Sequence, residues 1–232
     1  IDTSLDGLTI VYDGANGAAS SVGPEILSGL GAKVININVN PDGLNINDHC
    51  GSTHIEGLQV AVQQHNADLG IANDGDADRC LLVDEKGQVL DGDQIMLLCA
   101  LKLKEEGKLK DDTVVGTVMS NIGFHKAAEE LGMKTVSTAV GDRYVLEYMR
   151  EHNLSVGGEQ SGHVIFLDHN TTGDGMLTAV QVAALMKEKN QPLSELAGIM
   201  TKYPQVLINV RVATKTGWED NDLIKAAIVT AE

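Results

Sequence analysis

The segment Asp-Gly-Asp-Ala-Asp-Arg at residues 74–79 places three aspartates at alternate positions directly behind a short apolar run, Leu69–Ala72. Carboxylates that lie about 4 Å apart repel each other by roughly 4 kcal/mol per pair at an effective dielectric constant near 20. Such a loop is unstable by itself unless a cation lies inside it. We therefore predict that Asp74, Asp76 and Asp78 bind a metal ion.

The donor set indicates which metal this is. Carboxylate oxygens select hard cations, and Mg²⁺ accepts a few protein carboxylates while it keeps positions for water or a phosphate oxygen. Mg²⁺ is therefore the expected cofactor, and chemistry on phosphate the expected use. A calcium-binding EF-hand loop is an alternative, because Asp74, Asp76, Asp78 and Glu85 match its positions 1, 3, 5 and 12, but Arg79 replaces the required glycine at position 6. A solvated acidic turn is the remaining alternative.

Arg79 directly follows the aspartates. It could simply neutralise them, but a guanidinium beside a metal that carries phosphate can make two parallel contacts to phosphoryl oxygens. We assign Arg79 a catalytic role on that basis.

A second polar set, Gly-Gly-Glu-Gln-Ser-Gly-His at residues 157–163, also follows a strand-like run. Glu159 and Ser161 alternate, so in an extended loop they face the same way and can offer an acceptor and a donor to adjacent sugar hydroxyls. An ordinary polar turn into a hairpin is the alternative. His163 is a candidate for proton transfer, against the alternative of a half-exposed residue at the start of a strand.

The segment Val-Gly-Asp-Arg-Tyr at residues 140–144 contains a third candidate set. Its default reading is a glycine turn in which Asp142 caps the start of a helix. Arg143 could reach an anionic ligand bound beside the polar loop at 157–163, so we include Gly141, Asp142 and Arg143 among the predicted substrate-binding residues.

Segments rich in β-branched residues alternate with segments of helical period, which predicts an α/β fold built from parallel strand-helix-strand units. The order recurs after about 100 residues. We predict two similar α/β domains, each a mixed, mostly parallel sheet flanked by helices: residues 1–107 with the metal-binding loop, residues 108–213 with the sugar-binding loop, and residues 214–232 as a linker or the start of a truncated C-terminal domain.

The composition excludes several partner classes. With 17 Lys and Arg against 33 Asp and Glu, the net charge of −16 repels nucleic acid and anionic membrane surfaces. The sequence contains no apolar run of membrane-spanning length. The three cysteines, Cys50, Cys80 and Cys99, lack CxxC spacing and favour reduced thiols in a cytoplasmic setting.

Together the two polar loops, DGDADR and GGEQSGH, resemble those of the α-D-phosphohexomutase superfamily. The further stretches VGDRYVLE, NTTGDG and PDGLNINDHCGSTH resemble its bacterial phosphoglucosamine mutase branch, whereas the phosphomannomutase and phosphoglucomutase relatives usually carry another residue at Gln160. In that family, Ala77 stands where glycine is common.

The resemblance implies that the three aspartates hold Mg²⁺ against the phosphate of a phosphoserine, and that Glu159 and Ser161 bind the sugar. It also implies interconversion of glucosamine 6-phosphate and glucosamine 1-phosphate through a bisphosphorylated sugar. The family's serine loop and its C-terminal phosphate-binding loop have no match in this chain, so it resembles the middle two of four domains and is expected to lack turnover alone. A phosphomannomutase or phosphoglucomutase fragment and a non-catalytic cation-binding domain are the alternatives.

Overall fold

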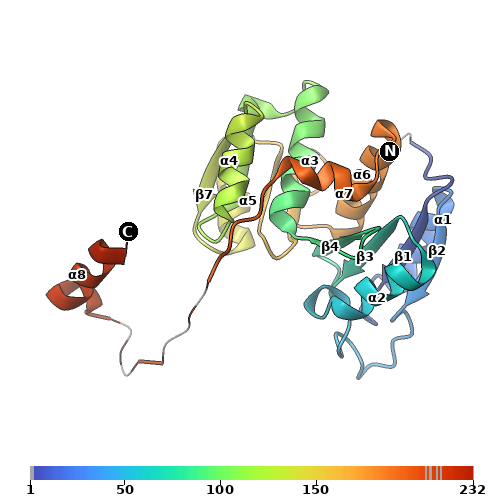
Figure 1. The fold of residues 1–232 in the computed structure, drawn as a ribbon, viewed down its shortest axis with the longest axis horizontal. Helices are drawn as coiled ribbons and strands as arrows, with labels where there is room; N and C mark the ends of the chain where they lie inside the picture. Colours follow the sequence, from blue (N-terminus) through green and yellow to red (C-terminus); the bar gives the residue numbers. More distant parts are fainter. Residues whose placement is uncertain (1–2, 207, 209–210, 213, 215, 232) are drawn as a thin grey trace.

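The computed structural model describes residues 3–206, 208, 211–212, 214 and 216–231. It contains two sheets, each with helices on both faces, which confirms the predicted α/β fold (Figure 1). The first sheet has the order β2-β1-β3-β4-β5 and the second the order β7-β6-β8-β9. Their strands are β1 (Thr9–Asp13), β2 (Lys33–Ile37), β3 (Leu69–Asn73), β4 (Cys80–Asp84), β5 (Val89–Leu90), β6 (Thr113–Thr117), β7 (Lys134–Thr138), β8 (Val156–Gly158) and β9 (Val164–Phe166).

The two sheets share one pattern of strand pairing. In the first, β1 pairs in parallel with β2 and β3, and β3 pairs antiparallel with β4. In the second, β6 pairs in parallel with β7 and β8, and β8 pairs antiparallel with β9. The predicted internal repeat is therefore present in the fold, and both sheets are mixed.

The helices follow the same repeat. They are α1 (Val22–Gly29), α2 (Glu56–His65), α3 (Gly92–Glu105), α4 (Ile122–Glu130), α5 (Asp142–Glu151), α6 (Gly175–Lys189), α7 (Leu193–Leu196) and α8 (Asp222–Ala231). Helix α2 covers one face of the first sheet around Val11 and Val83, and α5 covers one face of the second around Val115 and Ile165. None of the helices within the described residues is both long and apolar enough to cross a membrane.

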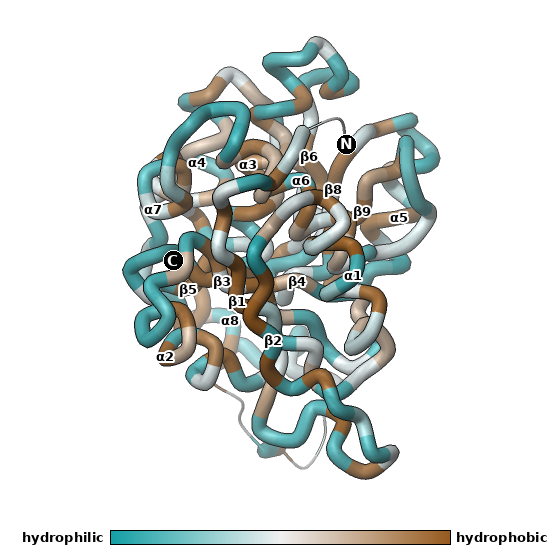
Figure 2. Tube along the Cα trace, turned by 90° about the vertical axis from the view of Figure 1, so that its right-hand side faces the viewer, coloured by the Kyte–Doolittle hydropathy of each residue, from teal (hydrophilic) through white to brown (hydrophobic). Residues whose placement is uncertain are grey.

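The helix that directly follows each sheet packs on the sheet of the other repeat. Helix α3 follows the first sheet but contacts β6 and β8, while α6 follows the second sheet but contacts β3 and β4. The two helices also pack against each other, and one continuous apolar core runs from Leu5 to Met200 through both sheets. Hydrophobic residues line β1 and β3 in the middle of the molecule (Figure 2). The two repeats therefore share one core.

The packing of α3 on the second sheet and of α6 on the first bears on the predicted domain boundary at residue 107. Helix α3 ends at Glu105, just before that boundary, but it packs on the second sheet. The division at residue 107 stays a prediction, as does the assignment of residues 214–232. Helix α8 lies apart from both sheets in Figure 1, and its Leu223 and Val229 are exposed.

Helices α3 and α6 each begin with a glycine that contacts a loop of the other repeat. The Gly92 N–H donates to the carbonyl of Gln160 at 2.9 Å, and the Gly175 N–H donates to the carbonyl of Ala77 at 2.9 Å. A Cβ at either glycine would overlap backbone atoms, those of Glu159 for Gly92 and of Arg79 for Gly175. At the start of each helix, the backbone of the glycine therefore lies in direct contact with the backbone of the opposite loop.

Aspartates cap both helices. The Asp91 side chain accepts the Gln94 N–H at 3.3 Å and starts α3, and the Asp174 side chain accepts the Leu177 N–H at 2.9 Å and starts α6. Within the first turn of α3, Asp93 is fully buried and accepts the N–H of Asn121 at 2.7 Å. Burial raises the pKa of Asp93 to about 6, and the charge of Asp91 adds to the effect, while Lys202 and the Asn121 N–H oppose it.

We predict that Gly92→Ala and Gly175→Ala each lower the free energy of unfolding by about 1 to 3 kcal/mol, because the added methyl group meets backbone that cannot rotate away. Gly29→Ala is the matched control: it lies in α1 with open space around its Cβ position and should gain about 0.5 to 1 kcal/mol. Urea unfolding monitored by circular dichroism measures all three. Equal effects at the three positions would contradict the close fit.

A second prediction concerns pH. An unfolded aspartate has a pKa of about 3.9, so the raised pKa of Asp93 means that the folded state prefers the protonated form. The stabilisation from this group is complete below about pH 4 and is lost as the pH rises through about 6. Asp93→Asn should therefore be more stable than the unchanged protein at pH 8, by on the order of 2 kcal/mol, and equal to it near pH 4. Urea unfolding at a series of pH values tests this, and parallel stability curves for the two proteins would contradict it.

Candidate functional site

The three aspartates lie in the loop between β3 and β4, at the carboxyl end of β3. One oxygen from each of Asp74, Asp76 and Asp78 lies within 4.8 Å of the other two, although Asp74 is buried, Asp78 half-buried and Asp76 exposed. In an α/β fold, ligands gather at the carboxyl ends of parallel strands. The structure therefore brings the predicted metal ligands together at a typical ligand-binding position.

The electrostatics of this loop suit a cation. Burial raises the pKa of Asp74, and the charges of Asp78 and Asp76 raise it further, whereas the Arg79 N–H and guanidinium lower it. Among the described residues, the buried Oδ1 of Asp78 has no hydrogen-bond partner. A hard divalent cation would satisfy that oxygen and offset the repulsion, so the residues present fit the predicted metal.

Arg79 lies beside the same carboxylates. Its Nε is 3.5 Å from Oδ2 of Asp74 and 3.9 Å from Oδ1 of Asp78, and 43% of its side chain is exposed. The guanidinium thus partly neutralises the aspartates and remains open to a ligand on its exposed side. Its role toward phosphate stays a prediction.

Asn73 and Tyr12, which the sequence did not single out, help to hold the loop in place. The Asn73 side chain donates to the Arg79 carbonyl at 2.7 Å and accepts the hydroxyl of buried Tyr12 at 3.0 Å. Ala77 has a φ of 61°, in the left-handed region that favours glycine. The nearness of Asn73 to the aspartates is visible in the sequence, but its partner Tyr12 lies 61 residues earlier and no local pattern connects them.

The second loop meets the first across the junction between the repeats. Arg79 and His163 form an isolated antiparallel bridge, and the Cys80 N–H donates to the Gly162 carbonyl at 3.0 Å. Two loops that are more than 80 residues apart in sequence therefore form one surface.

His163 is buried where the two loops meet. Its side chain is 3% exposed, and its Nε2 is 3.4 Å from Oδ2 of Asp78 and 3.8 Å from Oδ2 of Asp142. Within the described part of the chain, neither ring nitrogen has a hydrogen-bond partner. The alternative of a half-exposed strand-start residue is wrong, because the loop at Gly173 covers the imidazole ring.

Glu159 belongs to the same cluster. Its carboxylate accepts the N–H of Gly141 at 3.0 Å, which ties the sugar-binding loop to the start of α5. Gly141, with a φ of 129°, is the cap of that helix, and Asp142 is its first residue, so the default reading of Asp142 as the cap is wrong. The carboxylate of Asp142 is free to point toward His163 instead.

Two other predicted residues lie at the protein surface. Ser161 is exposed at the tip of its loop. Arg143 is 80% exposed and forms an ion pair at 2.7 Å with Glu147, one turn along α5. The structure therefore pairs Arg143 with its own helix, and its contact with an anionic ligand stays a prediction.

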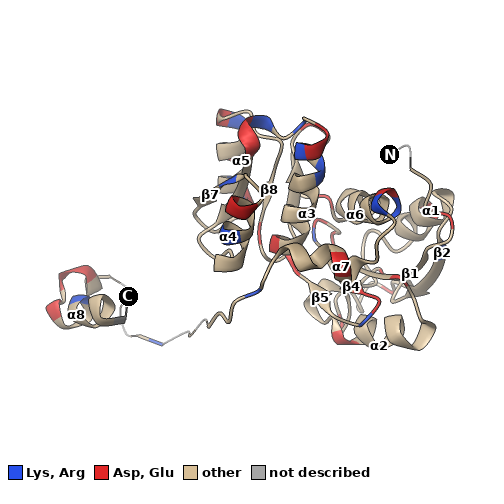
Figure 3. Cartoon of the chain, turned by 45° about the horizontal axis from the view of Figure 1, so that its top comes forward, with Lys and Arg blue, Asp and Glu red and all other residues tan. Residues whose placement is uncertain are grey.

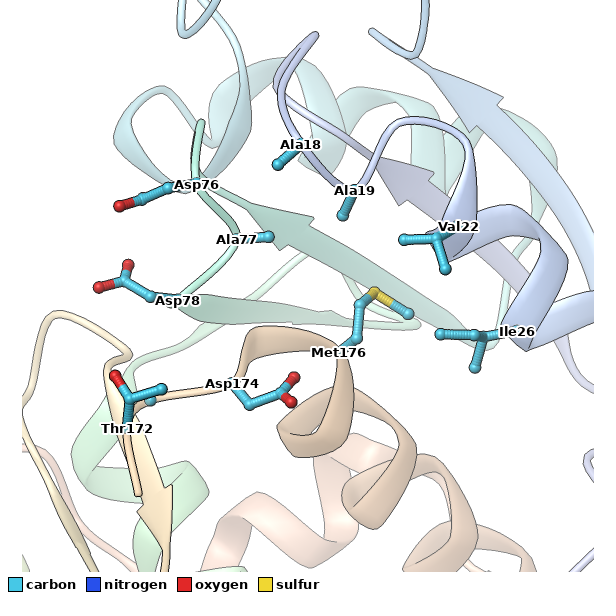
Figure 4. Close-up of a pocket in the computed structure, with 11 residues that line it drawn as sticks. Ala18, Ala19, Val22, Ile26, Asp76, Ala77, Asp78, Thr172, Asp174 and Met176 are labelled. Atoms are coloured by element: carbon cyan, nitrogen blue, oxygen red, sulfur yellow. The ribbon is translucent and has the colours of Figure 1, made fainter. Parts of the chain in front are cut away.

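A hollow of about 420 Å³ lies beside the metal loop. Asp76 and Asp78 point to one side of it, and Val22, Ile26 and Met176 form an apolar wall on the other (Figure 4). Basic residues appear in Figure 3 as short separate segments near acidic ones, in keeping with the net charge of −16. The site is thus acidic on one wall and apolar on the other.

The EF-hand alternative fails on the structure. The loop lies between two strands rather than two helices, and Glu85, the expected twelfth ligand, accepts the hydroxyl of Ser194. All three cysteines are buried and free, as predicted.

The chain matches two models of one protein family. The description of the first is phosphoglucomutase/phosphomannomutase, alpha/beta/alpha domain II, over residues 2–87, and that of the second is domain III of the same family, over residues 91–203. The phosphoglucosamine mutase of Bacillus subtilis is 54% identical over 231 residues, which are 100% of this chain and 52% of that protein. The phosphoglucosamine mutase of Symbiobacterium thermophilum is 58% identical over 228 residues, 98% of this chain and 51% of that protein.

Solved structures share the fold. A phosphoglucomutase/phosphomannomutase family protein of Burkholderia thailandensis has a TM-score of 0.76 at 23% identity, over 89% of this chain and 45% of its own. The N-acetylphosphoglucosamine mutase of Aspergillus fumigatus, in complex with GlcNAc-6P and magnesium, has a TM-score of 0.71 at 22% identity, over 91% of this chain and 49% of its own. The chain spans about half the length of the curated relatives it matches. The resemblance to this family is confirmed: the chain belongs to the phosphoglucomutase/phosphomannomutase family, of which it contains domains II and III, and it is similar to bacterial phosphoglucosamine mutases over its whole length.

Proposed function

We propose that this chain is the central half of a Mg²⁺-dependent mutase that interconverts glucosamine 6-phosphate and glucosamine 1-phosphate. The observation that carries the proposal is the cluster of three aspartates within 4.8 Å, set against His163 of the second loop. The names of the bacterial relatives support the amino sugar as substrate. The phosphoglucomutase/phosphomannomutase description of the family keeps glucose and mannose phosphates as the second candidates.

In this proposal Asp74, Asp76 and Asp78 hold Mg²⁺. When bound, the ion supplies positive charge to a phosphoryl group during its transfer. The exposed side of the Arg79 guanidinium binds the same group through paired N–H donors. These residues position the phosphoryl group and neutralise its charge.

The second loop binds the sugar. Glu159 and Ser161 bind adjacent hydroxyl groups, with Gly141 and Asp142 at the start of α5 beside them. The attacking hydroxyl oxygen forms the new bond to phosphorus as the bond to the serine oxygen breaks, and its proton goes to His163. His163 lies between Asp78 and Asp142, with its Nε2 3.4 Å from an oxygen of the first and 3.8 Å from an oxygen of the second.

The phosphoserine of this proposal lies outside the 232 residues, in the part of the enzyme that the chain does not span. The chain by itself therefore binds the metal but completes no turnover. Its partners are the remaining portions of the same enzyme and the phosphosugar.

We expect the chain to bind Mg²⁺ with one dominant site, measured by isothermal titration calorimetry. Asp76→Asn should weaken that binding by about tenfold or more, because it removes one of three anionic ligands. Asp220→Asn, a remote exposed position, removes the same formal charge and should leave the affinity unchanged. The affinity should also fall as the pH is lowered, because the raised pKa of Asp74 lets protons compete with the metal. Equal affinities for the two variants would argue for a diffuse acidic surface.

The substrate is tested in the full-length enzyme. We expect a higher kcat/KM for glucosamine 6-phosphate than for glucose 6-phosphate or mannose 6-phosphate, by roughly 10-fold or more if the 2-amino group is read by polar contacts. A preference for a hydroxy sugar would reassign the substrate, and turnover by the 232-residue chain alone would contradict the placement of the phosphoserine.

A further inference from the structure

The segment that leaves the second repeat, residues 201–205 (the exit segment), passes directly over the N-terminus of α4. The Asn121 side chain donates to the Tyr203 carbonyl at 2.8 Å and accepts the Tyr203 N–H at 3.0 Å, as a neighbouring strand would. The Thr201 carbonyl lies so close to Gly123 that a side chain there would overlap it. The exit segment is therefore fixed to the fold before the chain leaves it.

The exit segment is also attached to the start of α3. The Nζ of Lys202 lies 2.5 Å from Oδ2 of Asp91, the residue that caps α3, and the Asp91 side chain is only 9% exposed. The Lys202 side chain is 51% exposed, so solvent screens this ion pair in part. The start of α3 is the same helix end that donates the Gly92 N–H to the sugar-binding loop.

A third contact reaches the sugar-binding loop itself. The Gln205 side chain donates to the Met119 carbonyl at 2.9 Å and accepts the Gln160 side-chain N–H at 3.3 Å. Gln160 lines a hollow of about 720 Å³ together with Asp91, Lys202 and Gln205, and it does not line the hollow that contains Asp76 and Asp78. Its side chain thus faces the exit segment.

Two polar groups of Gln160, the backbone carbonyl and the side-chain NH2, therefore have partners. Its carbonyl accepts the Gly92 N–H, and its side-chain amide donates to Gln205. Glu159 and Ser161, on either side of it in the sequence, are the residues that the proposed function assigns to the sugar.

We propose that Gln160 is a positioning residue, not a sugar ligand: through its bond to Gln205 it couples the sugar-binding loop to the exit segment, and so to whatever part of the enzyme that segment leads into. The sugar-binding role of the loop rests on the proposed function, but the coupling is a property of the chain itself. A shift of the exit segment that breaks the bond loosens Glu159 and Ser161 together, although the backbone bonds of Gln160 and Gly162 still hold the turn at 159–162.

The coupling is measurable in the ligand-free chain by amide hydrogen exchange observed by NMR. The reporters are the amides of Gly92, bonded to the Gln160 carbonyl, and Gly162, bonded to the Glu159 carbonyl. We expect Gln205→Ala and Gln160→Leu each to raise the hydrogen-exchange rate of these two amides about fivefold, which corresponds to the loss of one hydrogen bond. The double variant should raise it no further than either single variant, because both remove the same bond.

Gln191→Ala, an exposed glutamine beyond the C-terminal end of α6, is the matched control and should change neither amide. The amides of β1 serve as the reference for global stability and should exchange at one rate in all variants. In the full-length enzyme, Gln205→Ala should raise KM for the sugar phosphate several-fold with little change in kcat, whereas loss of a direct sugar ligand would follow Gln160→Leu alone.

Unchanged exchange in both single variants, additive effects in the double variant, or a KM effect confined to Gln160→Leu would each overturn the proposal. Because exchange is measured without metal or sugar, such a result is distinct from a failure of Mg²⁺ to bind at the aspartates.

Discussion

The site depends on two backbone contacts between the repeats, made by the first residues of α3 and α6. Each helix starts with a capping aspartate followed by a glycine, and each glycine N–H bonds to a loop of the opposite repeat. Because α3 and α6 are exchanged between the two sheets, neither loop is held by its own repeat alone. The loops at 74–79 and 157–163 therefore keep a fixed distance, as the proposed phosphoryl transfer between a metal-bound phosphate and a sugar hydroxyl would require.

Electrostatics place a second constraint on this arrangement. Burial raises the pKa of Asp74, the charges of Asp78 and Asp76 raise it further, and Arg79 offsets only part of this effect. His163 is buried between Asp78 and Asp142, one carboxylate from each repeat. The fold holds these negative charges close together at a position where a bound cation and phosphate would lower the repulsion. Without such a cation, the net charge of −16 would repel an anionic substrate.

Much of this was accessible from the sequence, because the informative signals are local. The alternate aspartates at 74–78, the alternating Glu159 and Ser161, and the repeated strand-helix order each depend on residues close together in the chain. The repeat also predicted two similar sheets. Family resemblance then added roles that spacing alone left open.

The rest depends on contacts between distant residues. No local pattern shows that α3 packs on the second sheet, because an apolar helix fits either sheet equally well by its composition. The burial of His163 follows from the junction between the repeats, whereas the capping of α5 by Gly141 and the pairing of Gln160 with Gln205 arise within the second repeat. Arg143 differs from these residues. The sequence predicted that its charge would contact an anionic ligand, but its exposed side chain forms an ion pair with Glu147, one turn along the same helix.

The central claim is that loops from two repeats form one metal-centred site. Paramagnetic broadening by Mn²⁺, a hard cation with the same preference for oxygen ligands as Mg²⁺, tests it most directly in an NMR spectrum of the chain. The account predicts that substoichiometric Mn²⁺ broadens the amides of residues 74–79 and 159–163 together, and that excess Mg²⁺ reverses both effects. Broadening confined to residues 74–79, or scattered over the acidic surface, would contradict it.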